Sequence, residues 1–185
     1  LEAGADVHAT NNFGEPALML AKNDEVAKVL LEAGAKLDVQ NENGDTALHF
    51  AVLCKRNDFV KVLIDAGANV DVQNKDGKTA LHRAVESNNA ENVYHRDVAY
   101  ECKDVIKVLI DAGVNTDIKA TDGDMKDCTA REYAVMRAEF GSIVYKEIVN
   151  IIDAAMLARD VVLHALRTAR RALLLLPAAP ALVID

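Results

Sequence analysis

One segment of about ten residues occurs three times in this chain, and its repetition restricts the possible folds more than any other feature. Each copy starts with an acidic residue, continues through a Lys-Val-Leu core and ends in Gly: Glu25–Gly34, Asp58–Gly67 and Asp104–Gly113. Leu1–Gly4 matches the end of a further copy, and the terminal glycines are spaced by 30, 33 and 46 residues. A base period of 33 residues, with three missing once and 13 added once, is typical of stacked repeat proteins.

Each copy is predicted to form the second helix of its repeat. We expect Asp58 to cap the amino end of one such helix, because its carboxylate can accept hydrogen bonds from amides of the first turn. Gly67 follows as a residue that can adopt the left-handed conformation that ends a helix. The expected apolar faces, at positions i, i+3, i+4 and i+7, consist of Val26, Val29, Leu30 and Ala33; Phe59, Val62, Leu63 and Ala66; and Val105, Val108, Leu109 and Ala112.

The first helix of each repeat is predicted from a Thr-Ala-Leu-His motif. This motif occurs as Thr46–His49 and Thr79–His82, and the two threonines are the expected N-caps. Tight turns are expected between repeats at Asn43-Gly44, Asp76-Gly77 and Asp122-Gly123, because Gly tolerates a positive φ. Short extended arms are expected where apolar and polar residues alternate, at Leu37 and Val39 and at Val70 and Val72.

These motifs resemble ankyrin repeats. The Thr-Pro-Leu-His tetrad of that family corresponds to Thr46–His49 and Thr79–His82, and its Gly-Ala-Asp-Val-Asn stretch to segments 4–8, 34–38, 67–71 and 113–117. The resemblance implies an all-α solenoid of stacked helix-turn-helix units with β-hairpin loops. The expected bounds are 1–10 for a partial repeat, about 11–40, 41–73, 74–119 and 120–155 for repeats 1 to 4, and 156–185 for a C-terminal amphipathic helix with a Pro-containing tail.

The first and last repeats depart from this pattern. Repeat 1 has Pro16–Met19 in place of the tetrad and three fewer residues, so we expect it to be shorter and less stable. Repeat 4 has Thr129–Glu132 after a four-residue expansion at 124–127, and Ala155 stands where the terminal Gly is expected. Leu1 falls inside a second helix, from which we expect this chain to belong to a longer array.

His49 and His82 are the first candidates for a chemical site. As metal ligands they would need further donors at about 2 Å, and the nearby Cys54 completes no recognisable ligand spacing. The resemblance implies instead that each His bonds its own Thr and the backbone, which ties one repeat to the next. The sequence also contains no nucleophile with an evident base, no phosphate loop and no distinctive carboxylate pair. We therefore expect no enzyme activity, no metal and no cofactor.

The candidate binding surface consists of the hairpin tips and the adjoining first helices. By analogy with the family, variable positions flank the turn glycines and begin the concave face, which Leu53 and Cys54 extend. The candidate contact residues are Phe13, Glu15, Glu42, Asn43, Asp45, Lys75, Asp76, Lys78 and Glu86. The alternative for any one of them is a solvated polar edge without a partner.

An insertion of about 13 residues within 86–103 provides a second candidate surface in repeat 3. Tyr and Arg are favoured anchors in interfaces, and the insertion contains Tyr94, Arg96 and Tyr100. It therefore predicts a projecting loop or helix extension that contacts a partner. The alternative is a longer helix whose residues only pack on the stack.

The charge is distributed unevenly along the chain. The net charge is −8, to which residues 1–155 contribute 17 basic and 27 acidic side chains and residues 156–185 four basic and two acidic ones. An acidic solenoid disfavours nucleic acid and anionic membranes as partners and favours a basic or neutral protein surface. The apolar run at 172–184 is too short for a transmembrane helix. Three cysteines without a spaced pair indicate a reducing compartment, hence a cytoplasmic protein or a secreted effector that acts in a host cytosol.

The tail after 155 allows four interpretations. It can be a capping helix on the last repeat, a docking helix similar to the boxes by which some ankyrin proteins join ubiquitin ligases, a membrane-surface helix, or a segment foreign to the repeats, and we favour the capping helix. Its apolar stripe ends at Pro177 and Pro180. We predict a monomeric, non-catalytic protein-protein interaction module. The alternative is a substrate-recruiting adaptor of a ubiquitin ligase that uses this tail.

Overall fold

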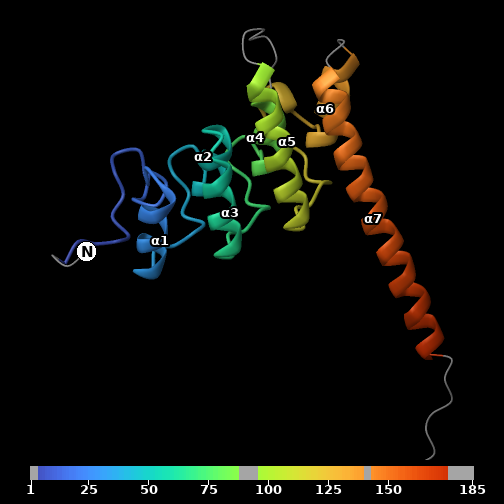
Figure 1. Ribbon diagram of the computed structural model, residues 1–185, viewed down its shortest axis with the longest axis horizontal. Coiled ribbons are helices and arrows are strands. Elements are labelled where there is room, and N and C mark those ends of the chain that lie inside the picture. The colour runs from blue at the N-terminus through green and yellow to red at the C-terminus, as the bar shows by residue number, and fades with distance from the viewer. Residues whose placement is uncertain (1–3, 88–95, 140–142, 175–185) are drawn as a thin grey trace, which may run out of the picture. The chain divides into compact units, whose positions relative to one another are not determined.

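The computed structural model describes residues 4–87, 96–139 and 143–174, with only the backbone at 96–102 and 170–174. The chain divides into two compact bodies, Leu1–Ile152 and Asp153–Asp185. The described helices are α1 (Asp24–Glu32), α2 (Ala47–Leu53), α3 (Asn57–Asp65), α4 (Ala80–Glu86), α5 (Arg96–Asp111), the 3-10 helix η1 (Gly123–Met125), α6 (Ala130–Glu139) and α7 (Ile143–Leu174). Helices α1 to α6 follow one another in chain order across the first body (Figure 1).

The first body is built from two rows of helices. An inner row consists of α2, α4 and α6, which contact one another in sequence, and an outer row of α1, α3 and α5 does the same. Each inner helix of repeats 2 and 3 also packs on the outer helix that follows it, α2 on α3 and α4 on α5. The core between the rows is made of completely buried apolar side chains such as Leu48, Phe59 and Leu81. The predicted all-α solenoid of stacked repeats is confirmed.

Local sequence explains where these helices begin and end. Thr46 and Thr79 are the N-caps of α2 and α4, as predicted, and each takes part in a reciprocal capping box with the His three residues later. After α3, Gly67 lies at φ 92° and its N–H donates to the Ile64 carbonyl at 2.9 Å. The Ala68 N–H donates to the Leu63 carbonyl at 3.0 Å, which completes a Schellman motif. The prediction that Gly67 ends this helix is confirmed.

The predicted N-cap of α3 is wrong by two residues. Arg56 is the N-cap, and Asp58 lies in the first turn. The preceding helix explains the difference, because Lys55 adopts the left-handed conformation at φ 57° and the Arg56 N–H donates back to the Ala51 carbonyl at 2.9 Å. Since this second Schellman-type end uses only two residues to leave α2, the next helix starts earlier than Asp58.

The predicted apolar face of α1 is wrong, because Leu30 is only half-buried and Val26, Val29 and Ala33 are exposed. Val26 is 44% exposed, whereas Phe59 at the equivalent position of α3 is 0% exposed. Phe59 lies on α3, which packs on α1 of repeat 1, and the Arg56 guanidinium, which donates to the Ala21 carbonyl, lies 4.3 Å from its ring centroid. Within the described part of the chain no helix precedes α1, so nothing equivalent covers Val26. Ala27, not Val26, is the fully buried residue of α1.

The arms between repeats are turns, not strands, within the described residues. Leu37 and Val70 lie in turns, although both side chains are half-buried as the alternation indicated. Side chains occupy the amides that a β-ladder would use: the Asn69 N–H donates to Asp38 Oδ1 at 3.1 Å, and the Asp71 N–H to Asn69 Oδ1 at 3.0 Å. The expectation of extended arms is therefore wrong at Leu37 and Val70, whereas Val39 and Val72 lie outside both turns and strands.

The terminal repeats differ from the central ones as their sequences indicated. In repeat 1, Ala17–Leu20 forms turns instead of a helix, with the Met19 N–H donating to the Pro16 carbonyl at 3.0 Å. Its Leu18 and Met19 are nevertheless completely buried. In the last repeat no Gly follows the second helix, and α7 continues through Ala155 to Leu174. In the second body this helix carries exposed apolar side chains, including Leu157, Val161 and Leu166.

Two turn glycines should differ in their sensitivity to Ala. Gly67→Ala adds a Cβ in open space at φ +92°, so it should lower the free energy of unfolding by about 1 kcal/mol through backbone strain alone. Gly44→Ala at φ +77° should cost clearly more, because its Cβ would lie 2.7 Å from the Lys75 backbone nitrogen. Urea denaturation of both variants measures the difference. Equal losses would show that the turns of repeats 2 and 3 do not pack as closely as described.

Candidate binding surface

The tips of successive hairpins are joined into a row by backbone hydrogen bonds. The Glu42 N–H donates to the Phe13 carbonyl at 3.0 Å, and the Lys75 N–H donates to the Asn43 carbonyl at 3.0 Å. The Thr121 N–H makes the equivalent hydrogen bond to the Asp76 carbonyl at 2.7 Å. Four turns from four repeats therefore lie side by side, and their outward side chains have fixed relative positions.

An Asn side chain holds each of the first three turns in shape. Asn41 Oδ1 accepts from the N–H groups of Asn43 and Asp45 at 2.9 and 3.0 Å. Asn11 and Asn74 make the same pair of bonds two and four residues ahead. Sequence reasoning missed this role. The signal was an Asn three residues before each turn Gly, which is a position where Asn side chains commonly bond local backbone amides.

His49 connects repeats 2 and 3. Its Nδ1 accepts from the Thr46 N–H at 3.2 Å and lies 2.9 Å from Thr46 Oγ1, so Nε2 carries the proton and donates to the Lys78 carbonyl at 3.0 Å. The structural role that the resemblance implied is confirmed for this residue. Burial lowers the pKa of His49, which keeps the ring neutral.

His82 repeats only half of this arrangement. Its Nδ1 bonds Thr79 at 3.2 Å to N and 2.8 Å to Oγ1, but its buried Nε2 faces the carbonyl of Cys128 without a hydrogen bond of normal geometry. Four extra residues, which include the buried Met125, precede Cys128. The spacing between the turn Gly and the tetrad position in repeat 4 therefore differs from that in repeats 2 and 3. Burial lowers the pKa of His82 to about 4.

Four of the predicted contact residues belong to an ion-pair network. Lys78 is buried, and its ammonium lies 2.7 Å from Glu86 Oε1 and 4.0 Å from Asp76 Oδ2. Arg83 of α4 pairs with Asp45 at 3.2 Å and with Glu86 at 3.3 Å. We name Asp45, Asp76, Lys78, Arg83 and Glu86 the ion-pair network. Because it joins two hairpins to α4, the hairpins and the inner helices form one continuous surface, and the side chain of Lys78 is occupied in holding it together.

The remaining hairpin candidates lie at the surface. Phe13 is 66% exposed, Glu42, Asn43 and Lys75 are exposed, and Glu15 is half-buried. Of the insertion residues, Tyr94 lies outside the described residues. Arg96 and Tyr100 lie on α5, which begins eight residues before the repeated segment at Asp104, and only their backbone is described.

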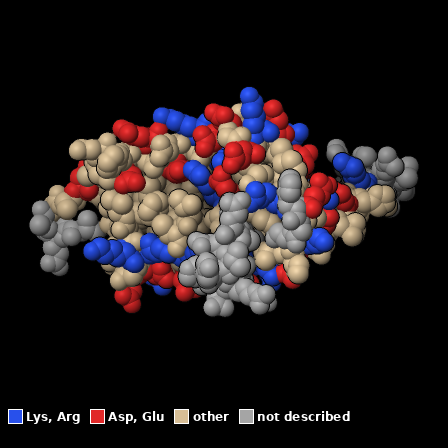
Figure 2. Space-filling model, turned by 90° about the horizontal axis from the view of Figure 1, so that it is seen from above, with Lys and Arg blue, Asp and Glu red and all other residues tan. Residues whose placement is uncertain are grey.

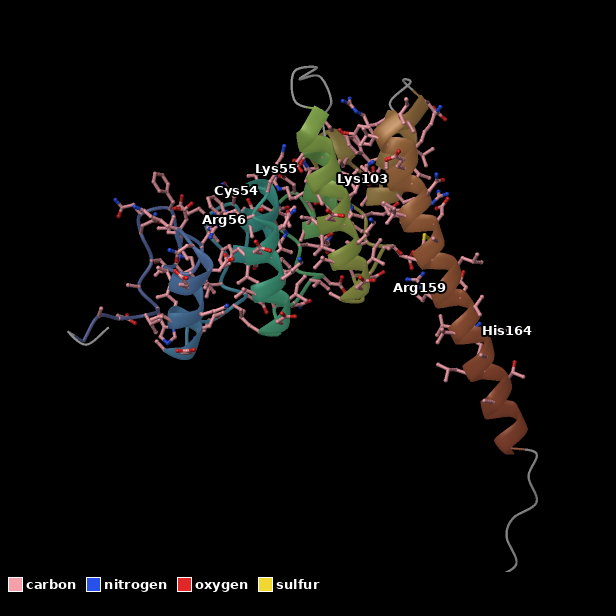
Figure 3. All side chains as sticks on the ribbon, viewed as in Figure 1. Cys54, Lys55, Arg56, Lys103, Arg159 and His164 are labelled. Carbon is pink, nitrogen blue, oxygen red and sulfur yellow. The ribbon has the colours of Figure 1, made fainter. Side chains whose placement is uncertain are left out.

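An apolar group on the inner row was only partly anticipated. Leu53 is 49% exposed at the position that Glu86 occupies one repeat later, and Phe50 corresponds in the same way to Arg83. Leu20 of repeat 1, aligned on its Pro16 tetrad, corresponds to Phe50 and is 47% exposed. We name Phe13, Leu20, Phe50 and Leu53 the apolar patch. Figure 3 marks its border in repeat 2, where Cys54, Lys55 and Arg56 follow the end of α2.

Repeat 4 replaces the Thr–His pair by a Thr–Glu pair. The Thr129 N–H donates to Glu132 Oε2 at 2.8 Å, and the Glu132 N–H donates to Thr129 Oγ1 at 3.1 Å. This bonding holds the pKa of the Glu132 carboxyl below its usual value. The pair is a capping box at the start of α6, and the sequence signature Thr-x-x-Glu was sufficient to predict it.

The described residues provide neither a metal site nor a membrane-spanning helix. No group of three or more His, Cys, Asp and Glu side chains that could hold a metal ion occurs in the described part of the chain. Among the described helices, none has the length and apolar character needed to cross a membrane.

Comparison with known proteins gives a consistent result. The family model for ankyrin repeats, which spans three copies, matches residues 1–74 and 21–121. Many solved structures match, and one is the crystal structure of an ankyrin repeat domain from Acinetobacter baumannii AYE. It is 29% identical, has a TM-score of 0.68, and the match covers 83% of this chain and 71% of that chain. No curated protein matches the chain.

The neutral, buried state of His82 should make stability depend on pH. Its pKa is about 4 in the folded chain and about 6.5 when unfolded, so only the unfolded chain binds a proton between these values. Stability should therefore fall as the pH drops from about 6.5 to about 4, with roughly 1 kcal/mol per pH unit from this residue. Urea unfolding from pH 7.5 to 4.5 should give a shallower slope for His82→Gln. His164→Gln, at an exposed position, should leave the slope unchanged, and an identical slope in both variants would contradict the assignment.

Proposed function

This chain belongs to the ankyrin-repeat family, a family of protein-protein interaction modules, and from that premise we propose that it binds a protein partner through its hairpin tips, inner helices and the insertion in repeat 3. The ankyrin fold is a known non-catalytic scaffold. The proposal accordingly includes no catalytic role, no cofactor and no metal for this chain.

The exposed apolar side chains near the row of hydrogen-bonded turns support this proposal most. Phe13, Leu20 and Leu53 expose about half or more of their surface on the face where hairpins and inner helices meet. Large apolar side chains that remain exposed next to each other often mark interaction sites in soluble proteins. The row of hydrogen-bonded turns fixes their positions before binding, which lowers the entropic cost of association.

The insertion supports the proposal because it contains Tyr and Arg residues and because it lies next to an inner helix in the chain. Arg96 and Tyr100 lie on the first turns of α5, next in the chain to the inner helix α4. Together with Tyr94 they would extend the binding surface beyond the hairpins and supply aromatic and guanidinium anchors.

Charge and composition support the proposed type of partner, oligomeric state and cellular location. The acidic balance of residues 1–155 favours a partner with a basic or neutral surface. We assign the chain to a cytosol, its own or that of a host, and to a monomeric state. The alternative role in a ubiquitin ligase depends on the tail that contains Pro177 and Pro180, which lies outside the described residues. No observation favours that alternative.

Affinity capture followed by mass spectrometry tests the proposed surface. The double variant Phe13→Ser, Leu53→Ser should lose the partners that the full wild-type chain captures from extracts of its source cells, because it removes two exposed apolar contacts. Val29→Ser on α1 is the matched control, since Val29 is also an exposed apolar residue but lies on the outer row. Circular dichroism should show that both variants fold. A partner list that is the same for all three proteins would contradict the proposal.

A further inference from the structure

The binding surface changes character from one repeat to the next, and we infer that its partner presents an amphipathic segment in which apolar side chains adjoin a Lys or Arg. The apolar side chains would lie over repeats 1 and 2, and the basic group over the hairpin of repeat 3. This inference rests on the proposed function and specifies the chemistry of the partner.

Equivalent positions of successive repeats show the change. In repeat 2 the two outward positions of the inner helix are Phe50 and Leu53, and in repeat 3 the same positions are Arg83 and Glu86. At the turn position, exposed Phe13 of repeat 1 corresponds to Asp76 of repeat 3. A single surface therefore starts apolar and becomes charged within two repeats.

The charged half presents mainly carboxylates to solvent. The ion-pair network has three carboxylates and two cations, and the side chain of Lys78 is only 5% exposed. The side chain of Asp76 is 45% exposed and that of Glu86 is 29% exposed. The two most exposed members of the network are the carboxylates of Asp76 and Glu86, whereas Arg83 and Asp45 are 19% and 13% exposed, so an incoming cation meets carboxylates that are already held in position. Lys75 is the exposed cation of this hairpin, and it adjoins Asp76 in the chain.

The four side chains of the apolar patch carry no charge, and Glu15 and Glu42 are the charged residues that adjoin Phe13 in the hairpins. The members of the patch come from three segments, the first turn, the inner segment of repeat 1 and α2, and the hydrogen bond from the Glu42 N–H to the Phe13 carbonyl joins the turns of repeats 1 and 2. On the face shown in Figure 2, uncharged residues cover much of the area over the N-terminal repeats, whereas acidic and basic side chains crowd the area over the later ones. A polar or purely basic segment would leave Phe13 and Leu53 in water. An acidic one would meet Asp76 and Glu86, and like charges repel.

A library of random 12-residue peptides displayed on phage, panned on the full chain, tests this inference. The enriched peptides should combine Leu, Ile, Phe or Met with Lys or Arg. Synthetic copies should bind the wild type with a dissociation constant that rises between 50 and 300 mM NaCl, because part of the attraction is between charges. Fluorescence anisotropy measures both quantities.

Four variants separate the two halves of the surface. Leu53→Ser should weaken peptide binding by about fivefold or more, and Asp76→Asn by about twofold to threefold with a smaller salt dependence. Val29→Ser and Glu25→Gln, both on the exposed side of α1, should stay within about twofold. Thermal unfolding of each variant confirms that it is folded.

The possible outcomes distinguish this inference from the proposed function. Enrichment of acidic peptides, of peptides without apolar residues, or of no peptides would overturn the inference. If captured partners still depended on Phe13 and Leu53, the proposed function would stand in those cases. Peptides of the expected type that bind Leu53→Ser and Asp76→Asn as well as the wild type would also overturn the inference, because they would bind elsewhere.

Discussion

The packing of one repeat on the next is the constraint on which the rest of this structure depends. No single repeat of about 33 residues can bury its own apolar face, and a backbone hydrogen bond between neighbouring turns recurs at all three boundaries between the four repeats. At the boundary of repeats 2 and 3 two of the contacts are the Lys75 amide on the Asn43 carbonyl and the His49 ring on the Lys78 carbonyl. In both contacts a backbone carbonyl of one repeat accepts a hydrogen bond from the other repeat. They leave the side chains of the turn and of the inner helix free to vary.

This division between support and surface explains how binding residues can sit on a regular scaffold. Thr46 caps α2, His49 bonds across the repeat boundary, and Gly44 adopts a positive φ. These structural roles restrict which residue type can stand at each position. Phe50 and Leu53 are held by the same helix but face outward, and the next repeat carries Arg83 and Glu86 there without a change in backbone. Arg83 and Glu86 belong to the ion-pair network, and in the proposed function Phe50 and Leu53 are available to contact a partner.

The sequence predicted the fold well because its signals are local and repeated. Thr caps and left-handed glycines depend on a few neighbouring residues, and they recur in phase, so Thr79 and Gly67 were placed correctly. Errors occurred where the environment differs between copies. Val26 occupies the position of Phe59 but lacks a preceding helix in the described chain. Asp58 was displaced because Lys55, a non-glycine residue, adopts a positive φ. The candidate site was predicted less completely, since Leu20 is brought into line with Phe50 only when repeat 1 is aligned on Pro16.

Hydrogen–deuterium exchange on the chain with and without its captured partner is the most direct test of this account. Binding through the hairpin row and the inner helices should slow exchange of amides at 12–15, 42–45 and 75–78 and in α2 and α4. Exchange in the outer helices α1 and α3 should change little, because they form the opposite row. Protection confined to the outer helices, with no change at the turns, would contradict the central claim.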